Sequence, residues 1–362
     1  MILRKSNFEL LRIVAMFMVI LSHFFVHTDF PNNGGFTLNN ILINLLGIGK
    51  IGVAIFVLLS GYFLIDFKFD GKKVIRFSSQ VWFYGIVILL ISYLTGIGEI
   101  TEKIFYRSIL PFTSTNWFAR VYLLLLLVYP LINYILKKIS KRQVEKFILW
   151  FGIIWTILPV FSLYTIGNVR ITTIYLYVIG AYIKMYGFDG IGIFKHKVSL
   201  VLNNIFMVVS SVVAITYLRE ANVFFCGHED AFLAYNSVFL ILISIGFFLI
   251  FKDLEMDNNK YINIISKTIF GIYLIHDNGL LRNWIWNDIF KGYIYYDSSY
   301  LFLYSIICSI MVFSICGIID FIRIKFIEEP IFRNFDRNYE YWKAIIMTKI
   351  SVVLIDSLKK YR

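Results

Sequence analysis

Apolar residues recur along this chain in blocks of about 20, separated by short polar segments. An apolar block of that length can cross a bilayer as one helix, with its backbone polar groups paired inside the helix. The blocks lack the alternation that is typical of half-buried strands. We therefore predict an all-α, polytopic integral membrane protein with about ten transmembrane helices. The predicted spans are residues 8–28, 41–65, 77–97, 119–136, 147–164, 171–187, 199–219, 232–251, 262–281 and 299–322.

The composition agrees with this class and adds a topology. The chain is 59% hydrophobic and only 16% charged, yet it carries a net charge of +12. Most of its 35 lysines and arginines lie at the termini or in the loops that join an even span to the next odd one. Under the positive-inside rule both termini are therefore cytoplasmic. The positive charge is explained by topology, and a nucleic-acid partner is excluded.

No hydrophilic run is large enough for a soluble domain. We expect an integral-membrane domain over residues 1–335, followed by a basic amphipathic cytoplasmic tail over residues 336–362. That tail either lies on the anionic inner face of the bilayer or is solvated. The three cysteines, Cys226, Cys308 and Cys316, have no ligand spacing. They predict neither a zinc site nor a disulfide framework.

The first span carries four ionisable residues on one face. Glu9, Arg12, His23 and His27 follow at helical steps, and eleven residues at about 100° each return His23 to the face of Arg12. The two are about 16 Å apart along the axis, roughly half of the hydrocarbon thickness. Arg12 is then near the cytoplasmic surface and His23 near the outer one.

Each of these residues also has a plain interpretation. Arg12 could extend to the inner surface and pair with Glu9, and His27 is expected to be interfacial. His23 is favoured as functional, because ionisable groups inside spans are costly and usually mark a pathway or a reaction centre. Two histidines one turn apart could bind a metal ion, but the sequence offers no third ligand. We therefore expect no metal.

A second imidazole lies at a similar depth. His276 ends the segment SKTIFGIYLIH, whose span begins inside, so His276 also lies toward the outer leaflet. Tyr273, one turn earlier, could orient it or simply pack. An interfacial histidine bonded to a loop is the alternative.

Taken in order, these segments resemble the integral-membrane acyltransferase-3 family, which transfers acyl groups to surface carbohydrates. The similar segments are FELLRIVAMFMVILSHFF, GVAIFVLLSGYFL, NWFARVYLLLLLVYPLI, LYVIGAYI, SKTIFGIYLIH and IEEPIF, and they run from residue 7 to about 333. Two departures stand out. The chain has no room for the soluble esterase-like domain of some relatives, and Ser22 stands where others have a histidine beside His23.

The resemblance implies a membrane O-acyltransferase. Its donor would be a cytoplasmic acyl-coenzyme A, above all acetyl-CoA, and its acceptor a hydroxyl of a cell-surface or exported polysaccharide or of a glycolipid. The bacterial plasma membrane would be its location. The candidate residues are His23 and His276 for catalysis, Arg12, Ser60 and Tyr62 for the donor, and Trp117 and Tyr122 for the acceptor.

Several alternatives stay open. Ser60 could carry the acyl group, donate a hydrogen bond, or serve close helix packing next to a glycine. The segment HED at 228–230 could touch the acceptor or be a solvated loop. A transporter or flippase for a glycan precursor is the rival function, although such proteins often show two related halves that are not evident here. A glycan polymerase would need larger outer loops.

Overall fold

The structure is a computed structural model that describes residues 5–31, 35–46, 49–161, 168–188, 192–221, 232–335, 338, 339 and 341. It is 83% helical, and no strand occurs within those residues, so the all-α prediction is confirmed. The chain forms two compact units, residues 1–316 and 317–362. The predicted tail at 336–362 falls almost wholly outside the described residues, so the proposed domain boundary stays a prediction.

The α-helices are α1 (Ser6–His27), α2 (Leu38–Leu46), α3 (Lys50–Leu64), α4 (Gly71–Thr95), α5 (Glu102–Ile109), α6 (Trp117–Lys138), α7 (Lys141–Gly152), α8 (Leu158–Phe161), α9 (Val169–Tyr186), α10 (Gly192–Lys195), α11 (Lys197–Ala221), α13 (Val238–Lys252), α14 (Lys260–Ile265), α15 (Ile269–His276) and α16 (Leu301–Arg323). The π-helical segments are Ile153–Ile157, Trp284–Ile289 and Ile324–Glu328. The 3₁₀ segments are Pro111–Thr113, Ser266–Thr268 and Gly292–Tyr295.

Seven helical stretches within the described residues are long and apolar enough to cross a membrane. They are Ser6–His27, Leu38–Leu64, Gly71–Thr95, Trp117–Lys138, Lys141–Val160, Lys197–Leu218 and Leu301–Phe335, and residues 47 and 48 of the second stretch lie outside the described residues. The shorter apolar helix α13 does not reach that length, and α14 and α15 are separated by a 3₁₀ turn. The polytopic class is confirmed, whereas the count of ten and the cytoplasmic termini stay predictions.

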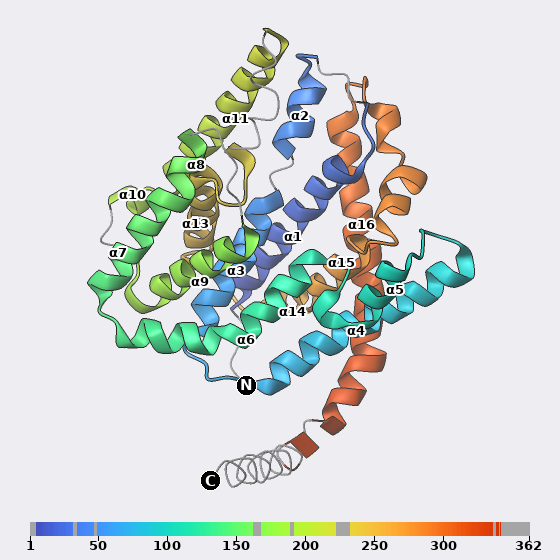
Figure 1. The fold of residues 1–362 in the computed structure, drawn as a ribbon, viewed down its shortest axis with the longest axis horizontal. Helices are drawn as coiled ribbons and strands as arrows, with labels where there is room; N and C mark the ends of the chain where they lie inside the picture. Colours follow the sequence, from blue (N-terminus) through green and yellow to red (C-terminus); the bar gives the residue numbers. More distant parts are fainter. Residues whose placement is uncertain are drawn as a thin grey trace, which may run out of the picture. The chain divides into compact units, whose positions relative to one another are not determined.

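The centre of the first unit is built around α3, which packs between α1 and α9 (Figure 1). Glycines make this close approach possible. A Cβ on Gly61 would collide with the backbone oxygen of Tyr177 in α9, and a Cβ on Gly180 would collide with that of Leu58 in α3. Likewise, Gly52 lies against the backbone of Ala15 in α1. Small residues let the backbones of membrane helices touch, which is a main source of helix association in lipid.

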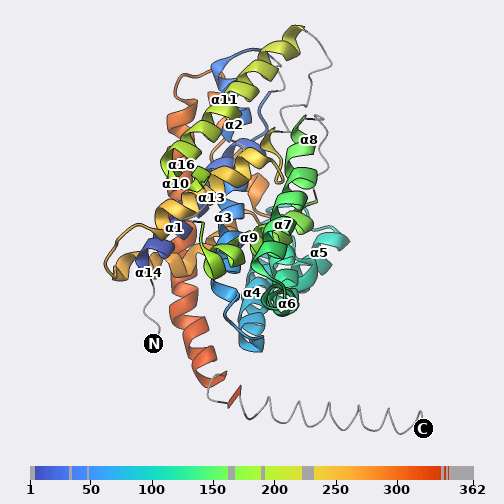
Figure 2. The ribbon, with the colours of Figure 1, turned by 90° about the vertical axis from the view of Figure 1, so that its left-hand side faces the viewer.

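A polar network joins α6 to the end of α3. The side-chain amide of Asn133 donates to the backbone oxygen of Leu64 at 2.8 Å, and the Tyr177 hydroxyl donates to Asn133 Oδ1 at 2.8 Å. Unsatisfied polar groups are costly where no water is present, so these bonds stabilise the junction. On another side of the first unit, α11 packs against α13 (Figure 2).

The side-chain amide of Asn287 forms hydrogen bonds with the backbone at the end of α1. Asn287, in the π-helical segment Trp284–Ile289, donates to the backbone oxygen of His27 at 2.9 Å and accepts from the backbone N–H of Asp29 at 2.8 Å. Helix ends leave backbone groups without intrahelical partners. Asn287 therefore fixes where α1 stops, and with it the two histidines of the last two turns.

Candidate active site

Two histidines from distant parts of the sequence meet at this end of α1. His23 Nδ1 lies 2.9 Å from Nε2 of His276, which ends α15. His276 is fully buried, whereas the His23 side chain keeps 14% of its surface exposed. The structure thus brings together the two candidates that the sequence placed at similar depth, and only His23 remains accessible.

The hydrogen bonds of the pair fix its neutral tautomer. His276 Nδ1 lies 2.7 Å from the backbone oxygen of Ile272, which only accepts, so that nitrogen carries the proton. His276 Nε2 is then the acceptor, and His23 Nδ1 must donate to it. The lone pair of a neutral His23 therefore lies on Nε2, which has no hydrogen-bond partner among the described residues. An accessible imidazole in this state can accept a proton.

Asp277 joins His23, His27 and His276 to form the histidine cluster, and it was not predicted from the sequence. Its carboxylate is 1% exposed and lies 3.9 Å from His23 Nδ1, 3.3 Å from His27 Nε2 and 3.8 Å from a guanidinium nitrogen of Arg282. An anion at this distance stabilises a protonated imidazole. The available signal was an aspartate directly after the histidine that ends an apolar segment.

His27 is also part of this cluster, although the sequence suggested an interfacial position. Its ring centroid lies 4.9 Å from that of His23. His23, His27 and Asp277 each offer a ligand atom within 4.8 Å of the others, so the structure supplies the third ligand that the sequence lacked. These residues could hold a divalent metal ion. The expectation that no metal takes part stays a prediction.

Tyr273 links this cluster to the start of α6. Its hydroxyl accepts from the backbone N–H of Phe118 at 3.0 Å, and its ring lies edge-on to His276 with centroids 6.3 Å apart. The N–H groups in the first turn of a helix have no intrahelical partner, so Tyr273 satisfies one of them. The neighbouring Trp117 packs edge-on against Tyr235, with ring centroids 5.4 Å apart. Trp117, a predicted acceptor residue, therefore directly precedes the residue that Tyr273 contacts.

Arg12 lies at the opposite end of α1. Its Nη1 donates to both oxygens of Glu9 at 3.0 Å, the pairing that the sequence analysis held open. The guanidinium also lies 5.9 Å from the centroid of the Phe63 ring. Because α1 is unbroken from Ser6 to His27, the separation of about 16 Å between Arg12 and His23 along the axis follows from helix geometry.

The remaining candidates lie on α3 and α6. Tyr62 packs on Phe8 near the Arg12 end, with ring centroids 5.4 Å apart. Ser60 donates to the backbone oxygen of Phe56 at 2.8 Å and lies 3.1 Å from the Tyr122 hydroxyl. Ser60 and Tyr122 therefore contact each other, and within the described residues neither is hydrogen-bonded to a histidine. The segment HED at 228–230, like Cys226, lies outside the described residues.

Together, these observations define a helical membrane protein with two imidazoles in contact at one end of its first helix. The chain belongs to the acyltransferase-3 family, because the family model described as an acyltransferase domain matches residues 5–321. No curated protein and no solved structure gives a match. The protein is thus a multi-pass membrane acyltransferase, as the ordered motifs suggested.

Proposed function

We propose that this acyltransferase moves an acetyl group from cytoplasmic acetyl-CoA to a hydroxyl of a cell-surface or exported polysaccharide, or of a glycolipid precursor. The observation that carries the proposal is the contact of 2.9 Å between His23 and His276 at the opposite end of α1 from Arg12. The donor binds at the Arg12 end with its thioester extended along α1. The acceptor reaches His23 from the outer side, in a bacterial plasma membrane.

The chemistry follows from the tautomer. His23 Nε2 takes the proton of the acceptor hydroxyl while the hydroxyl oxygen forms a bond to the thioester carbonyl carbon. The tetrahedral intermediate then breaks its carbon–sulfur bond, and the departing coenzyme A thiolate receives the proton from His23. Asp277, 3.9 Å from His23 Nδ1, stabilises the imidazolium between these steps.

The surroundings of Ser60 favour this direct transfer over a serine ester. The Ser60 hydroxyl donates to the carbonyl of Phe56, and within the described residues it is not hydrogen-bonded to a base that could activate it. A nucleophilic serine needs such a base within hydrogen-bonding reach. Ser60 instead belongs to the helix-packing surface of α3, next to Gly61.

Arg12 is the proposed anchor of the donor. Only Nη1 of its guanidinium is bonded to Glu9, and the side chain is 32% exposed. The remaining N–H groups can donate to the phosphates or the amide oxygens of coenzyme A, and charge-assisted bonds of this kind are strong. Tyr62, which packs on Phe8 toward the same end, would line the path of the donor arm.

The test is a transfer assay with purified protein in lipid nanodiscs. Labelled acetyl-CoA is mixed with a panel of candidate polysaccharides, and the label in the polysaccharide fraction is measured for the wild type and for His23→Ala. We expect transfer by the wild type and a loss of about 10²–10⁴-fold in the variant, the usual contribution of a positioned base. Full turnover by His23→Ala would refute the assignment of the base.

A further inference from the structure

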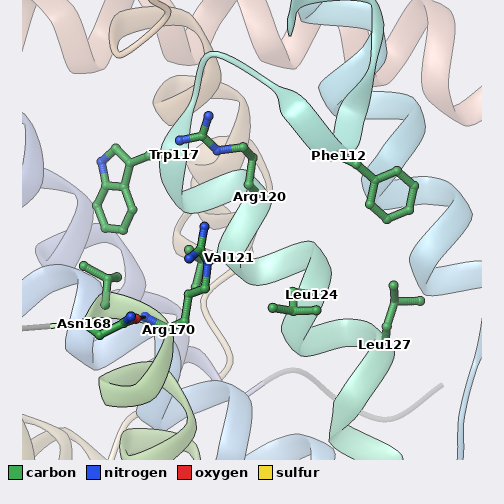
Figure 3. A pocket seen from close by; sticks show the side chains of 9 residues that line it. Phe112, Trp117, Arg120, Val121, Leu124, Leu127, Asn168 and Arg170 are labelled. Atoms are coloured by element: carbon green, nitrogen blue, oxygen red, sulfur yellow. Dashed lines mark hydrogen bonds between the residues drawn. The ribbon is translucent and has the colours of Figure 1, made fainter.

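A pocket of about 520 Å³ lies between the start of α6 and the start of α9 (Figure 3). This volume falls within the range of about 300–1,000 Å³ that is usual for small-molecule sites. Trp117, Arg120 and Arg170 line one part of it, and Figure 3 shows both arginine side chains extending into the space beside the tryptophan ring. Trp117 is a predicted acceptor residue, whereas neither arginine was predicted as a site residue from the sequence.

Within the described residues, no carboxylate balances the two guanidinium groups. Neither Arg120 nor Arg170 forms an ion pair with an acidic side chain in the part of the chain that the structure describes. Arg120 is half-buried, and the positive charges of Arg107 and Arg170 both act against its own. Like charges held close together are unfavourable and favour the binding of an anion. Guanidinium groups suit carboxylates and phosphates in particular, because they can donate two parallel hydrogen bonds.

The place of the pocket indicates which reactant would carry the anion. Trp117 is followed by Phe118, whose N–H is bound by Tyr273, and Tyr273 lies edge-on to His276. The start of α6, which lines the pocket, therefore contacts Tyr273 of the helix that ends at His276, whereas Arg12, the proposed anchor of coenzyme A, is at the other end of α1. An anion bound here belongs with the acceptor.

The other part of the pocket is apolar. It is lined by Phe112, Leu124 and Leu127, whose exposed fractions are 61%, 44% and 42%. Exposed leucines on a membrane-spanning helix face lipid. The pocket thus joins a cationic part to an apolar part, an arrangement that also suits an acceptor attached to a lipid.

From these observations we propose that the pocket binds the oxyanion of an anionic acceptor saccharide, with Arg120 and Arg170 on the anion and Trp117 against the sugar ring. The oxyanion is either the carboxylate of an acidic sugar or the phosphate that joins the saccharide to a carrier lipid. This inference rests on the proposed acyl transfer to a saccharide and adds the charge of the acceptor to it.

The test measures binding in the His23→Ala background, where no turnover interferes. Two probe pairs separate the sources of the anion. One pair is a glucuronate-terminated oligosaccharide and its glucose-terminated analogue. The other is a polyprenyl phosphate-linked glucose and a polyprenyl glucoside without the phosphate. We expect the anionic member of one pair to bind at least about tenfold more tightly, the effect of one or two charge-assisted hydrogen bonds.

Arg120→Gln and Arg170→Gln should each remove that preference. Arg170→Lys, which keeps the charge, should retain part of it. Lys103→Gln is the matched control, because it removes an exposed positive charge on α5 that does not line the pocket. Elution in gel filtration confirms that each variant is folded.

Equal binding of both members in both pairs would overturn the proposal, and so would a preference that survives in both glutamine variants. Displacement of the anionic probe by coenzyme A alone would also overturn it, because the pocket would then serve the donor. Acetyl transfer by the wild type to any acceptor is measured in parallel. If transfer occurs without an anion preference, only the pocket assignment fails.

Discussion

His23 Nδ1 and His276 Nε2 lie 2.9 Å apart, although 253 positions separate them in the chain. In this hydrogen bond His23 donates and His276 accepts, because the carbonyl of Ile272 fixes the proton of His276 on Nδ1. We therefore expect His276 to act on His23 as a positioning residue that holds the proposed reactive tautomer without touching either substrate.

Variants of His276 test whether it positions His23 through a hydrogen bond or only supports the packing of the helices. We expect His276→Ala to lower kcat by about tenfold or more, yet by less than the 10²–10⁴-fold expected for loss of the base itself. His276→Gln should recover part of the rate, because its side-chain oxygen can accept from His23 Nδ1. The measurement is kcat and KM with acetyl-CoA for both variants. Equal losses in the two variants would contradict a role through the hydrogen bond.

Asp277 is expected to act through its charge. Asp277→Asn keeps the shape but removes the anion 3.9 Å from His23 Nδ1. An interaction of about 1–4 kcal/mol at this distance corresponds to a loss in kcat of at least about fivefold. The donor KM should not change, since Asp277 is at the far end of α1 from Arg12. Steady-state kinetics with Asp277→Asn and Asp277→Glu check this, and unchanged kcat in both would rule the role out.

Arg12 should affect donor use more than chemistry. In Arg12→Gln we expect the KM for acetyl-CoA to rise about tenfold, from the loss of charge-assisted bonds, while kcat stays within about threefold. The KM of Arg12→Lys should lie between those of Arg12→Gln and the wild type, because a lysine keeps the charge but not the planar guanidinium group. An Arg12→Gln variant with normal KM and much reduced kcat would place Arg12 at the reaction centre instead.

Metal removal tests whether the histidine cluster transfers a proton or binds a metal ion. His23 Nδ1 is hydrogen-bonded to His276, and the Asp277 carboxylate already faces His27 and Arg282. We therefore expect transfer to be unaffected by EDTA and the purified protein to carry no stoichiometric metal in elemental analysis. Loss of activity that zinc restores would show that His23, His27 and Asp277 form a metal site.

Gly61 gives a prediction about stability. A Cβ at this position meets the backbone of Tyr177, so Gly61→Ala should force α3 and α9 apart and cost about 1–3 kcal/mol, the usual effect of overpacking. Gly192→Ala is the matched control, because nothing lies within 4 Å of a Cβ there. Thermal unfolding in detergent measures both. A Gly61→Ala protein as stable as the control would contradict the packing described here.

Helical periodicity was enough to predict the main features of α1. The spacing of Arg12 and His23 needs only a continuous helix, and Ser6–His27 is one. Periodicity did not predict the 3₁₀ turn at Ser266–Thr268, which separates two short α-helices within the predicted span 262–281. The Thr268 hydroxyl there donates to the backbone oxygen of Ile265 at 2.8 Å, and such local bonds compete with the regular helix.

The parts of the site that depend on tertiary contacts could not be predicted in the same way. Asp277 follows His276 directly, but only the packing of α15 against α1 brings its carboxylate to His23 and His27. The pairing of Arg120 with Arg170 likewise joins the starts of two helices that lie 50 positions apart. Neither separation carries a local signal in the sequence.

The continuity of α1 has one more consequence. A single rigid helix carries both the proposed donor anchor and the proposed base, so the span between them cannot stretch or shorten as substrates change. The helix therefore fixes the axial separation of Arg12 and His23 at about 16 Å. Carriers whose reactive carbon lies much nearer to their charged end would be rejected by length alone, whatever acyl chain they bear.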